Sequence, residues 1–221
     1  MIIDCISDLH GSYPKLEGGD LLIIAGDLTA RDRLSEFMTF FEWIKKQEYK
    51  KIVIICGNHD KYVMKVPSIM KENLPANAEY LLNSDCEYDG FHIWGSPNTL
   101  YFDGVNPDCN AFMLRLPGLM KEVWDTIPYN TDILVTHGPP RDILDHTRYE
   151  FRVGCEHLRD AVERIKPKLH VFGHIHEGYG IDIQSYPHDN FTSPIKQTTF
   201  VNCAHMNVDY CPINKPVRIV L

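Results

Sequence analysis

Residue types that bind metal ions gather in five short clusters of this sequence. The clusters are Asp8-Leu9-His10, Gly26-Asp27, Gly57-Asn58-His59-Asp60, Thr136-His137-Gly138 and Gly173-His174-Ile175-His176. They supply carboxylate and carboxamide oxygens and imidazole nitrogens, which suit borderline divalent cations such as Mn²⁺, Fe²⁺ or Zn²⁺. Ligands of these types in this number indicate two adjacent cations, and not one structural zinc held by thiolates.

Each cluster lies at the end of an apolar run that predicts a β-strand. The runs cover Ile2–Ile6, Leu21–Ala25, Lys51–Cys56, Asp132–Val135 and Leu169–Phe172. We therefore expect the five clusters to meet along one sheet edge. Asp8 and His10 are two residues apart, so both side chains would point to the same side if the strand end stays extended.

Glycines precede three of the candidate ligand groups, at Gly26, Gly57 and Gly173. Glycine lets the backbone turn sharply or approach another group closely without steric cost. The same three residues would also serve as ordinary turn glycines, and the two roles are compatible.

Length and charge limit the classes of protein to consider. A chain of 221 residues fits one domain, which we place at residues 1–221. The formal net charge is −8, with 30 acidic and 22 basic residues, so a broad basic face for long nucleic acid is not expected. The negative charge does not exclude small phosphates as ligands, because two bound cations would make the electrostatic potential in the site positive.

The cysteines and the apolar runs indicate a reducing, cytoplasmic setting. Seven cysteines are widely spaced and include no C-x-x-C pair, so a disulfide framework is not expected. The sequence opens directly on a predicted strand without a charged leader, and no run approaches the roughly 20 apolar residues of a membrane span. We expect no membrane partner, and the sequence does not predict an oligomeric state.

Strands and helices alternate along the first sixty residues, which is typical of an α/β fold. A helix is predicted near Leu34 to Gln47, because aromatic residues recur there at helical spacing, and Ser35 is a candidate cap. Further predicted elements are a helix at Val66–Glu72, a strand at Ala78–Leu82, a hairpin through Tyr88-Asp89-Gly90 into Phe91–Trp94, and helices at Pro117–Thr126 and Cys155–Ile165.

The segments between and after the motifs are predicted to complete the pocket and the second sheet. The irregular stretch between Trp94 and Pro117 is expected to form part of the pocket wall, because it lies between two ligand motifs. Three late segments are predicted to close a second sheet: Gly180–Gln184, Gln197–Asn202 and Val217–Val220. His92 and His170 lie within predicted strands and are expected to be structural.

The order and spelling of the five clusters resemble the calcineurin-like metallophosphoesterases, which carry D-x-H, G-D, G-N-H-[DE], a lone His and G-H-x-H. The resemblance extends to small metallophosphoesterase-domain proteins, similar to class III cyclic-nucleotide phosphodiesterases. It includes Trp94-Gly95-Ser96-Pro97, Thr136-His137-Gly138-Pro139-Pro140, and the stretch from Pro167-Lys168-Leu169-His170 through Glu177-Gly178-Tyr179-Gly180. The resemblance implies a four-layer α/β/β/α sandwich of two mixed sheets.

The resemblance also implies two ligand sets that share one carboxylate. The first set is Asp8, His10, Asp27 and His176. The second set is Asp27, Asn58, His137 and His174. The shared carboxylate would offset the repulsion between cations about 3.5 Å apart. Because His174 and His176 fall in different sets, the loop that carries them must bend.

The implied reaction is hydrolysis of a phosphate ester by attack of a metal-bound hydroxide on phosphorus. His59 lies next to a ligand but belongs to neither set. It is predicted to be the general acid or a hydrogen-bond donor to the transition state, with Asp60 orienting its ring. The implied cofactors are two divalent ions, with Mn²⁺ first and Fe, Zn, Ni or Co as alternatives.

The resemblance leaves the substrate open. Small phosphodiesters, including cyclic nucleotides, are the favoured class, because the chain is compact and resembles the phosphodiesterase group. A phosphomonoesterase or protein phosphatase is the alternative enzyme. A scaffold of the same fold without activity is the alternative from another class, and it is disfavoured because all seven ligand candidates and His59 are present.

Overall fold

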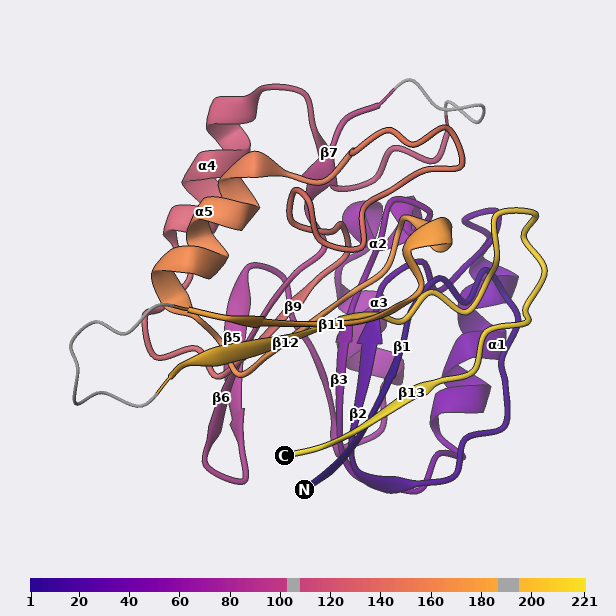
Figure 1. Cartoon of the computed structure of the whole chain (residues 1–221). Helices are drawn as coiled ribbons and strands as arrows, with labels where there is room; N and C mark the ends of the chain where they lie inside the picture. Colours follow the sequence, from indigo (N-terminus) through magenta and orange to yellow (C-terminus); the bar gives the residue numbers. More distant parts are fainter. Residues whose placement is uncertain (103–107, 187–194) are drawn as a thin grey trace.

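Two β-sheets lie face to face and carry the strands that precede the metal-binding clusters (Figure 1). The structure is a computed structural model, and it describes residues 1–102, 108–186 and 195–221. Each predicted strand before a cluster is present, and its bounds differ from the prediction by at most two residues.

The first sheet has the strand order β13-β1-β2-β3-β4. Its strands are β1 (Ile2–Ile6), β2 (Gly19–Ala25), β3 (Tyr49–Ile55), β4 (Ala78–Tyr80) and β13 (Val217–Val220). Strands β1 to β4 are parallel, so their carboxyl ends lie at the same edge of the sheet. This edge receives the first three metal-binding clusters.

Strand β13 corrects the prediction that Val217–Val220 closes the second sheet. It pairs antiparallel with β1 in the first sheet, with Ile3 opposite Ile219. Arg218 on β13 donates two hydrogen bonds of 2.8 Å to the carboxylate of Asp4 on β1. The paired charges hold the last strand beside the first.

The second sheet has the strand order β11-β12-β10-β9-β6-β5. Its strands are β5 (Ser84–Tyr88), β6 (Phe91–Ser96), β9 (Ile133–Thr136), β10 (Leu169–Phe172), β11 (Gly180–Ser185) and β12 (Gln197–Asn202). Strands β6, β9, β10 and β12 run parallel, whereas β5 and β11 are antiparallel edges. The predicted hairpin is confirmed, and its turn residues Asp89 and Gly90 both have positive φ.

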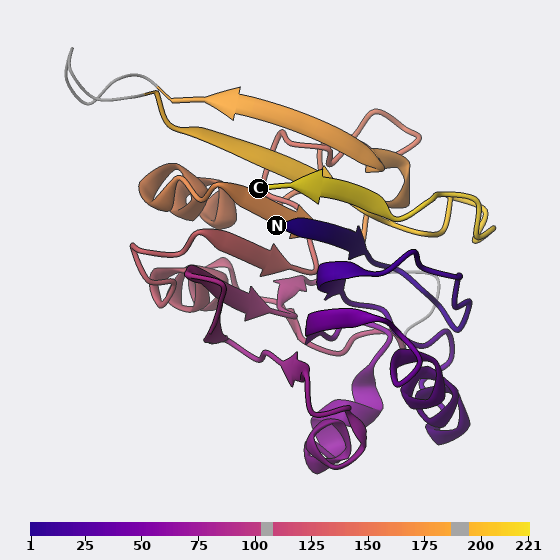
Figure 2. The ribbon, with the colours of Figure 1, turned by 90° about the horizontal axis from the view of Figure 1, so that it is seen from below.

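Helices cover the outer faces of both sheets, so the predicted four-layer α/β/β/α sandwich is confirmed (Figure 2). The first sheet carries α1 (Leu34–Ile44), α2 (Lys61–Lys65) and α3 (Ser68–Asn73), and the second carries α4 (Pro117–Asp125) and α5 (Glu156–Ile165). The aromatic stripe of α1, which includes Phe37, Phe40 and Phe41, packs on the first sheet. A separate apolar cluster, with Val53, Val135 and Val201, fills the space between the sheets.

Some short elements differ from the prediction. The helix α1 begins after Arg33, whose backbone N–H donates to the carboxylate of Glu36 at 3.0 Å, so Ser35 is not its cap. Helix α2 and the two-residue strands β7 (Thr99–Leu100) and β8 (Met113–Leu114) were not predicted. Elements this short present too few residues for a hydrophobic period.

No helix within the described residues has the length and apolar character needed to cross a membrane. The seven cysteines, all of them described, are free thiols, as expected.

His170 on β10 is a buried histidine between the second sheet and its helices. Its Nε2 lies 2.9 Å from the hydroxyl of Thr136, and that hydroxyl donates to the carbonyl of Gly138. The hydroxyl must therefore accept a hydrogen bond from Nε2–H. Nδ1 has no partner among the described residues, and burial lowers the pKa of His170 to about 3.

Substitution of His170 should make the folded state less sensitive to acid. The ordinary histidine pKa is 6.5, so between pH 6.5 and about 3 the unfolded chain binds a proton that the folded chain does not. Each pH unit in this window should remove up to about 1.4 kcal/mol of unfolding free energy. We expect His170→Gln to lose this slope in denaturant titrations with a chelator present.

The matched control is His157→Gln on α5, whose side chain is partly exposed. This variant should keep the pH slope of the parent protein. An unchanged slope in His170→Gln would show that His170 does not contribute to acid unfolding.

Candidate metal centre

The loops that follow β1, β2, β3, β9 and β10 converge at the end of the sandwich where these strands of both sheets terminate. Backbone hydrogen bonds extend the strand pairing into these loops: Asp8 N donates to Gly26 O at 2.9 Å, and His10 N donates to Asp27 O at 3.0 Å. In the second sheet, Gly173 N donates to the carbonyl of His137 at 3.0 Å. The clusters meet as predicted, but they follow strands of two sheets and do not lie along one sheet edge.

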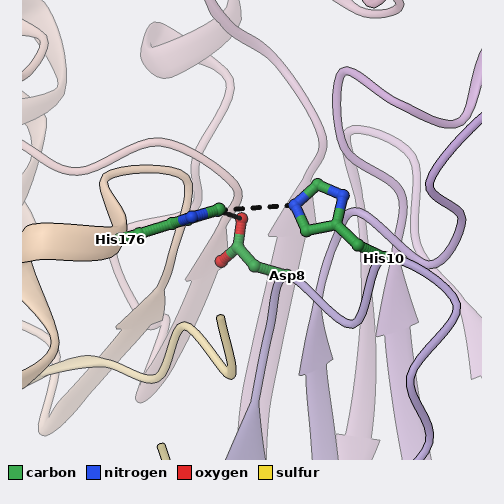
Figure 3. Close-up of side chains that lie close together, drawn as sticks. All are labelled: Asp8, His10 and His176. Carbon is green, nitrogen blue, oxygen red and sulfur yellow. Dashed lines mark hydrogen bonds and ion pairs between the residues drawn. The ribbon is translucent and has the colours of Figure 1, made fainter. Parts of the chain in front are cut away.

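Asp8, His10 and His176 form the first group of converging ligand atoms (Figure 3). His176 Nε2 lies 3.3 Å from Asp8 Oδ1 and 3.4 Å from His10 Nε2. On its other side, His10 Nε2 lies 3.6 Å from Asp27 Oδ2. Asp8 and His10 lie in the loop after β1, Asp27 in the loop after β2, and His176 in the loop after β10. The ligand atoms of these four side chains therefore face a common point from three loops.

Asp27, Asn58 and His137 form the adjoining group. His137 Nε2 lies 3.3 Å from Asp27 Oδ1 and 3.0 Å from Asn58 Oδ1. The ring of His174 lies beside the ring of His137, with 4.9 Å between the centroids. His174 is in none of the three-residue ligand groups, so this structure places it at the edge of the site.

Backbone carbonyls fix the orientation of two imidazoles. His137 Nδ1 lies 2.9 Å from the carbonyl of Ala25, and His176 Nδ1 lies 3.0 Å from the carbonyl of Asn207. Because a carbonyl accepts only, Nδ1 carries the proton in both rings. Their Nε2 atoms then face oxygen or nitrogen acceptors, and this contact requires either a second proton or a cation between them.

The ionisation of the buried carboxylates also indicates a site that can hold a cation. Burial would raise the pKa of Asp8, but the hydrogen bond and charge of His176 lower it to about 2. Burial would also raise the pKa of Asp27, but the charges of His137 and His59 hold it well below its usual range. Burial lowers the pKa of His10 to about 4, so this ring is a neutral donor of a lone pair. The donor set fits divalent cations.

Four of the candidate ligands have a left-handed backbone. The φ angles of Asp8, His10, Asp27 and His174 are 53°, 42°, 52° and 68°. Residues with side chains rarely adopt this region, and it costs about 1 to 3 kcal/mol each. The expectation of an extended backbone from Asp8 to His10 is wrong, because β1 ends at Ile6. The predicted bend between His174 and His176 is confirmed.

The three predicted glycines lie against the ligands themselves. A Cβ at Gly57 would collide with Asp27 Oδ1, and a Cβ at Gly173 would collide with Asp8 Oδ2. Gly26 has a φ of 102°, and a Cβ there would lie 2.5 Å from His137 Nδ1. Close approach is required at all three positions, and Gly26 also needs its unusual φ.

His59 adjoins the ligand groups, with Nε2 4.0 Å from Asp27 Oδ2. It also forms a three-residue group with His10 and Asp27, so its ring nitrogen is within reach of the site. Its Nδ1 lies 3.0 Å from the carbonyl of Ala30. This contact directs Nε2 toward the centre.

The prediction that Asp60 orients the ring of His59 is wrong. The Asp60 carboxylate accepts hydrogen bonds from the backbone N–H groups of Leu28, Thr29 and Gly57 at 2.8 to 3.1 Å, and from the hydroxyl of Thr29. Burial and the charge of Asp27 raise the pKa of Asp60 to about 7. Asp60 therefore ties the loop after β2 to the loop after β3.

Two residues near the centre were not found from the sequence. The ring of Tyr210 lies 5.1 Å from the ring of His10 and 5.0 Å from that of His176. Cys109 Sγ lies 3.3 Å from His59 Nδ1. Both belong to irregular segments outside the five clusters, where no spacing pattern identified them. Tyr210 has a positive φ, which is more common for turn residues such as Gly or Asn. Its residue type therefore gave no indication of the turn.

Residues 1–178 match the sequence profile of the family described as Calcineurin-like phosphoesterase. The chain belongs to this family. Metallophosphoesterase domain-containing protein 1 of Homo sapiens is 35% identical over 243 residues, which cover 98% of this chain and 70% of the relative. UPF0046 protein T07D4.2 of Caenorhabditis elegans is 31% identical, over 96% of this chain and 58% of the relative.

A solved structure shows the same fold. The crystal structure of TT1561 of Thermus thermophilus superposes with a TM-score of 0.55 at 14% identity, covering 83% of this chain and 84% of that chain. Membership of a phosphoesterase family with divalent metals agrees with the converging oxygen and imidazole ligands.

Replacement of Gly173 by alanine should weaken metal binding. The new methyl group would displace the carboxylate of Asp8, which belongs to the first ligand group. We expect Gly173→Ala to retain less divalent ion per chain than the parent protein after equilibration with Mn²⁺ and gel filtration, as measured by plasma emission spectroscopy.

Gly118→Ala is the matched control, because a Cβ on Gly118 would have no atom within 4 Å. It should retain metal at the parent level. Equal metal retention in both variants would show that Asp8 is not confined by Gly173.

Proposed function

We propose that this chain is a dinuclear metal-dependent phosphodiesterase acting on small phosphodiesters, with cyclic nucleotides as candidates. The observation that carries the proposal is the meeting of imidazole nitrogens and acidic oxygens at 3.3 to 3.6 Å with no side-chain cation between them among the described residues. Family membership supports the phosphoester chemistry.

The proposed ligands are the seven predicted residues. Asp8, His10, Asp27 and His176 would hold one cation. Asp27, Asn58, His137 and His174 would hold the other. The two oxygens of Asp27 support its shared role, because Oδ2 faces His10 and Oδ1 faces His137. Two divalent cations at these positions would polarise the phosphoryl oxygens and lower the pKa of an attacking water.

His59 is the proposed proton donor to the leaving oxygen. Its Nδ1–H donates to the carbonyl of Ala30, so proton transfer from Nε2, which lies on the side of the centre, requires the doubly protonated imidazolium form of the ring. The attacking water releases one proton to solvent, its oxygen forms the new P–O bond, and the bond to the leaving group breaks as that group takes the Nε2 proton of His59. Asp60 has a positioning role, because it fixes the loop on which His59 lies.

The lining of the adjacent cavity favours a diester over a monoester. No Lys or Arg side chain is among its described lining residues, so a second negative charge on phosphate would find no side-chain cation there. A phosphomonoesterase or protein phosphatase is the alternative.

We further propose Mn²⁺ as the first metal to test, and one domain over residues 1–221. We also propose a cytoplasmic setting, which the free cysteines support.

Hydrolysis by metal-stripped protein should return when a divalent metal is supplied. We expect bis-4-nitrophenyl phosphate to be cleaved with a higher kcat/KM than 4-nitrophenyl phosphate, in separate assays with Mn²⁺, Zn²⁺, Ni²⁺ and Mg²⁺. Preference for the monoester would identify a phosphomonoesterase. Absence of turnover with each metal, in protein shown to be folded by circular dichroism, would contradict catalysis and favour the scaffold.

Substitutions should separate proton donation from metal binding. His59→Gln should lower kcat by about 10² to 10⁴ and keep the bound metal, because a general acid contributes on this scale. Asp27→Ala should lose both turnover and paired metals. His92→Gln, on the partly exposed β6 position where His92 pairs with Glu87, is the histidine control. Parent-level turnover in His59→Gln would exclude the proposed acid.

A further inference from the structure

A cavity of about 530 Å³ opens beside the metal centre, and His174 and His176 line both. The rings of two other lining residues contact these histidines: Phe102 lies 5.4 Å from His174, and Tyr210 lies 5.0 Å from His176, between ring centroids. A substrate whose phosphate reaches the centre can therefore extend into this cavity. Its volume falls in the range of about 300 to 1,000 Å³ that is typical of small-molecule sites.

The inner end of the cavity is apolar. Met120 and Trp124 of α4 and Leu158 of α5 line it, and all three belong to the buried cluster between these helices and the second sheet. Val153 and Phe102 line the outer part and are 39% and 46% exposed. Large apolar side chains that stay exposed beside a site usually mark a surface that binds an apolar group.

Most residues of the wall are apolar, and two of its polar side chains have hydrogen-bond partners within the protein. The Asn98 side chain donates to the carbonyl of Phe112 at 3.2 Å and accepts from the hydroxyl of Ser96 at 3.1 Å. The carboxylate of Glu177 accepts from the backbone N–H of Arg148 at 3.0 Å. A ligand rich in hydroxyl groups would lose hydrogen bonds to water in this cavity and gain few in return.

We infer that this cavity receives a neutral, apolar ester group of the substrate, so that the chain prefers alkyl or aryl phosphodiesters to diesters of sugars. The inference rests on the proposed function and narrows its substrate class to diesters other than cyclic nucleotides, in which a sugar carries both ester bonds. Glu177 is the acidic side chain among the described lining residues, and no described lining residue is Lys or Arg. An ester group with its own negative charge would therefore be disfavoured, and burial of hydrocarbon would supply the selectivity.

The first test varies one ester group while the leaving group stays constant. The substrates are methyl, butyl and hexyl 4-nitrophenyl phosphate, with thymidine 5′-(4-nitrophenyl phosphate) as the sugar diester. We expect kcat/KM to rise by about fourfold for each buried methylene at first, and the hexyl ester to exceed the thymidine ester. A flat series, or a preference for thymidine, would overturn the inference and leave the phosphodiesterase proposal intact.

A variant locates the apolar group in the cavity. Val153→Gln places a neutral amide at the outer part of the cavity, away from the proposed ligands and His59. It should reduce the ratio of hexyl to methyl kcat/KM. Ile183→Gln is the control, because Ile183 is 60% exposed on β11 and does not line the cavity. A ratio that stays at the parent value in Val153→Gln would place the apolar group elsewhere.

Binding can be measured even if no diester is hydrolysed. Trp124 lines the cavity, so a nitrophenyl ester that enters it should quench tryptophan fluorescence in metal-free protein. We expect half-maximal quenching by the hexyl ester at least tenfold below the concentration needed for the methyl ester, with a weaker difference in Val153→Gln. Equal quenching curves for the two esters would refute the apolar cavity independently of catalysis.

Discussion

Two buried carboxylates, Asp8 and Asp27, lie where parallel strands of both sheets end, and their charge must be balanced inside the protein. Among the described residues their side-chain partners are the imidazoles of His10, His137 and His176, together with His59 at a longer distance. Imidazoles balance negative charge only when both ring nitrogens carry a proton, and a permanent cation such as Arg is lacking among these partners. This arrangement suits added divalent cations, and the surrounding loops serve to hold it.

The loops achieve this arrangement at a cost in backbone energy. Left-handed φ angles at ligand positions turn the side chains back toward the centre, and glycines remove the methyl groups that would obstruct the carboxylates. Asp60 compensates by accepting hydrogen bonds from the backbone of two loops at once. The rigidity of the centre therefore comes from a carboxylate that has no contact with the ring it was predicted to orient.

The strands could be predicted from the sequence because apolar runs are local properties, whereas the four-layer sandwich was expected only from the resemblance of the five motifs to a known family. The residue pattern placed β13 in the wrong sheet, since pairing with β1 depends on the contact between Asp4 and Arg218, far apart in the chain. It also missed Tyr210, which reaches the centre from an irregular loop. Such positions depend on tertiary packing, which a residue pattern does not encode.

The pairing of β1 with β13 also affects the order of events during synthesis. The amino group of Met1 donates to the carbonyl of Leu221, a separation of 220 residues, and His176 contacts Asp8 across most of the chain. A nascent chain on the ribosome can form β1 early, but one edge of that strand stays unpaired until Val217–Val220 emerge. Contacts between residues that lie this far apart in the sequence slow folding. The exposed edge of β1 is therefore the part of the newborn chain that most needs protection from association with other chains.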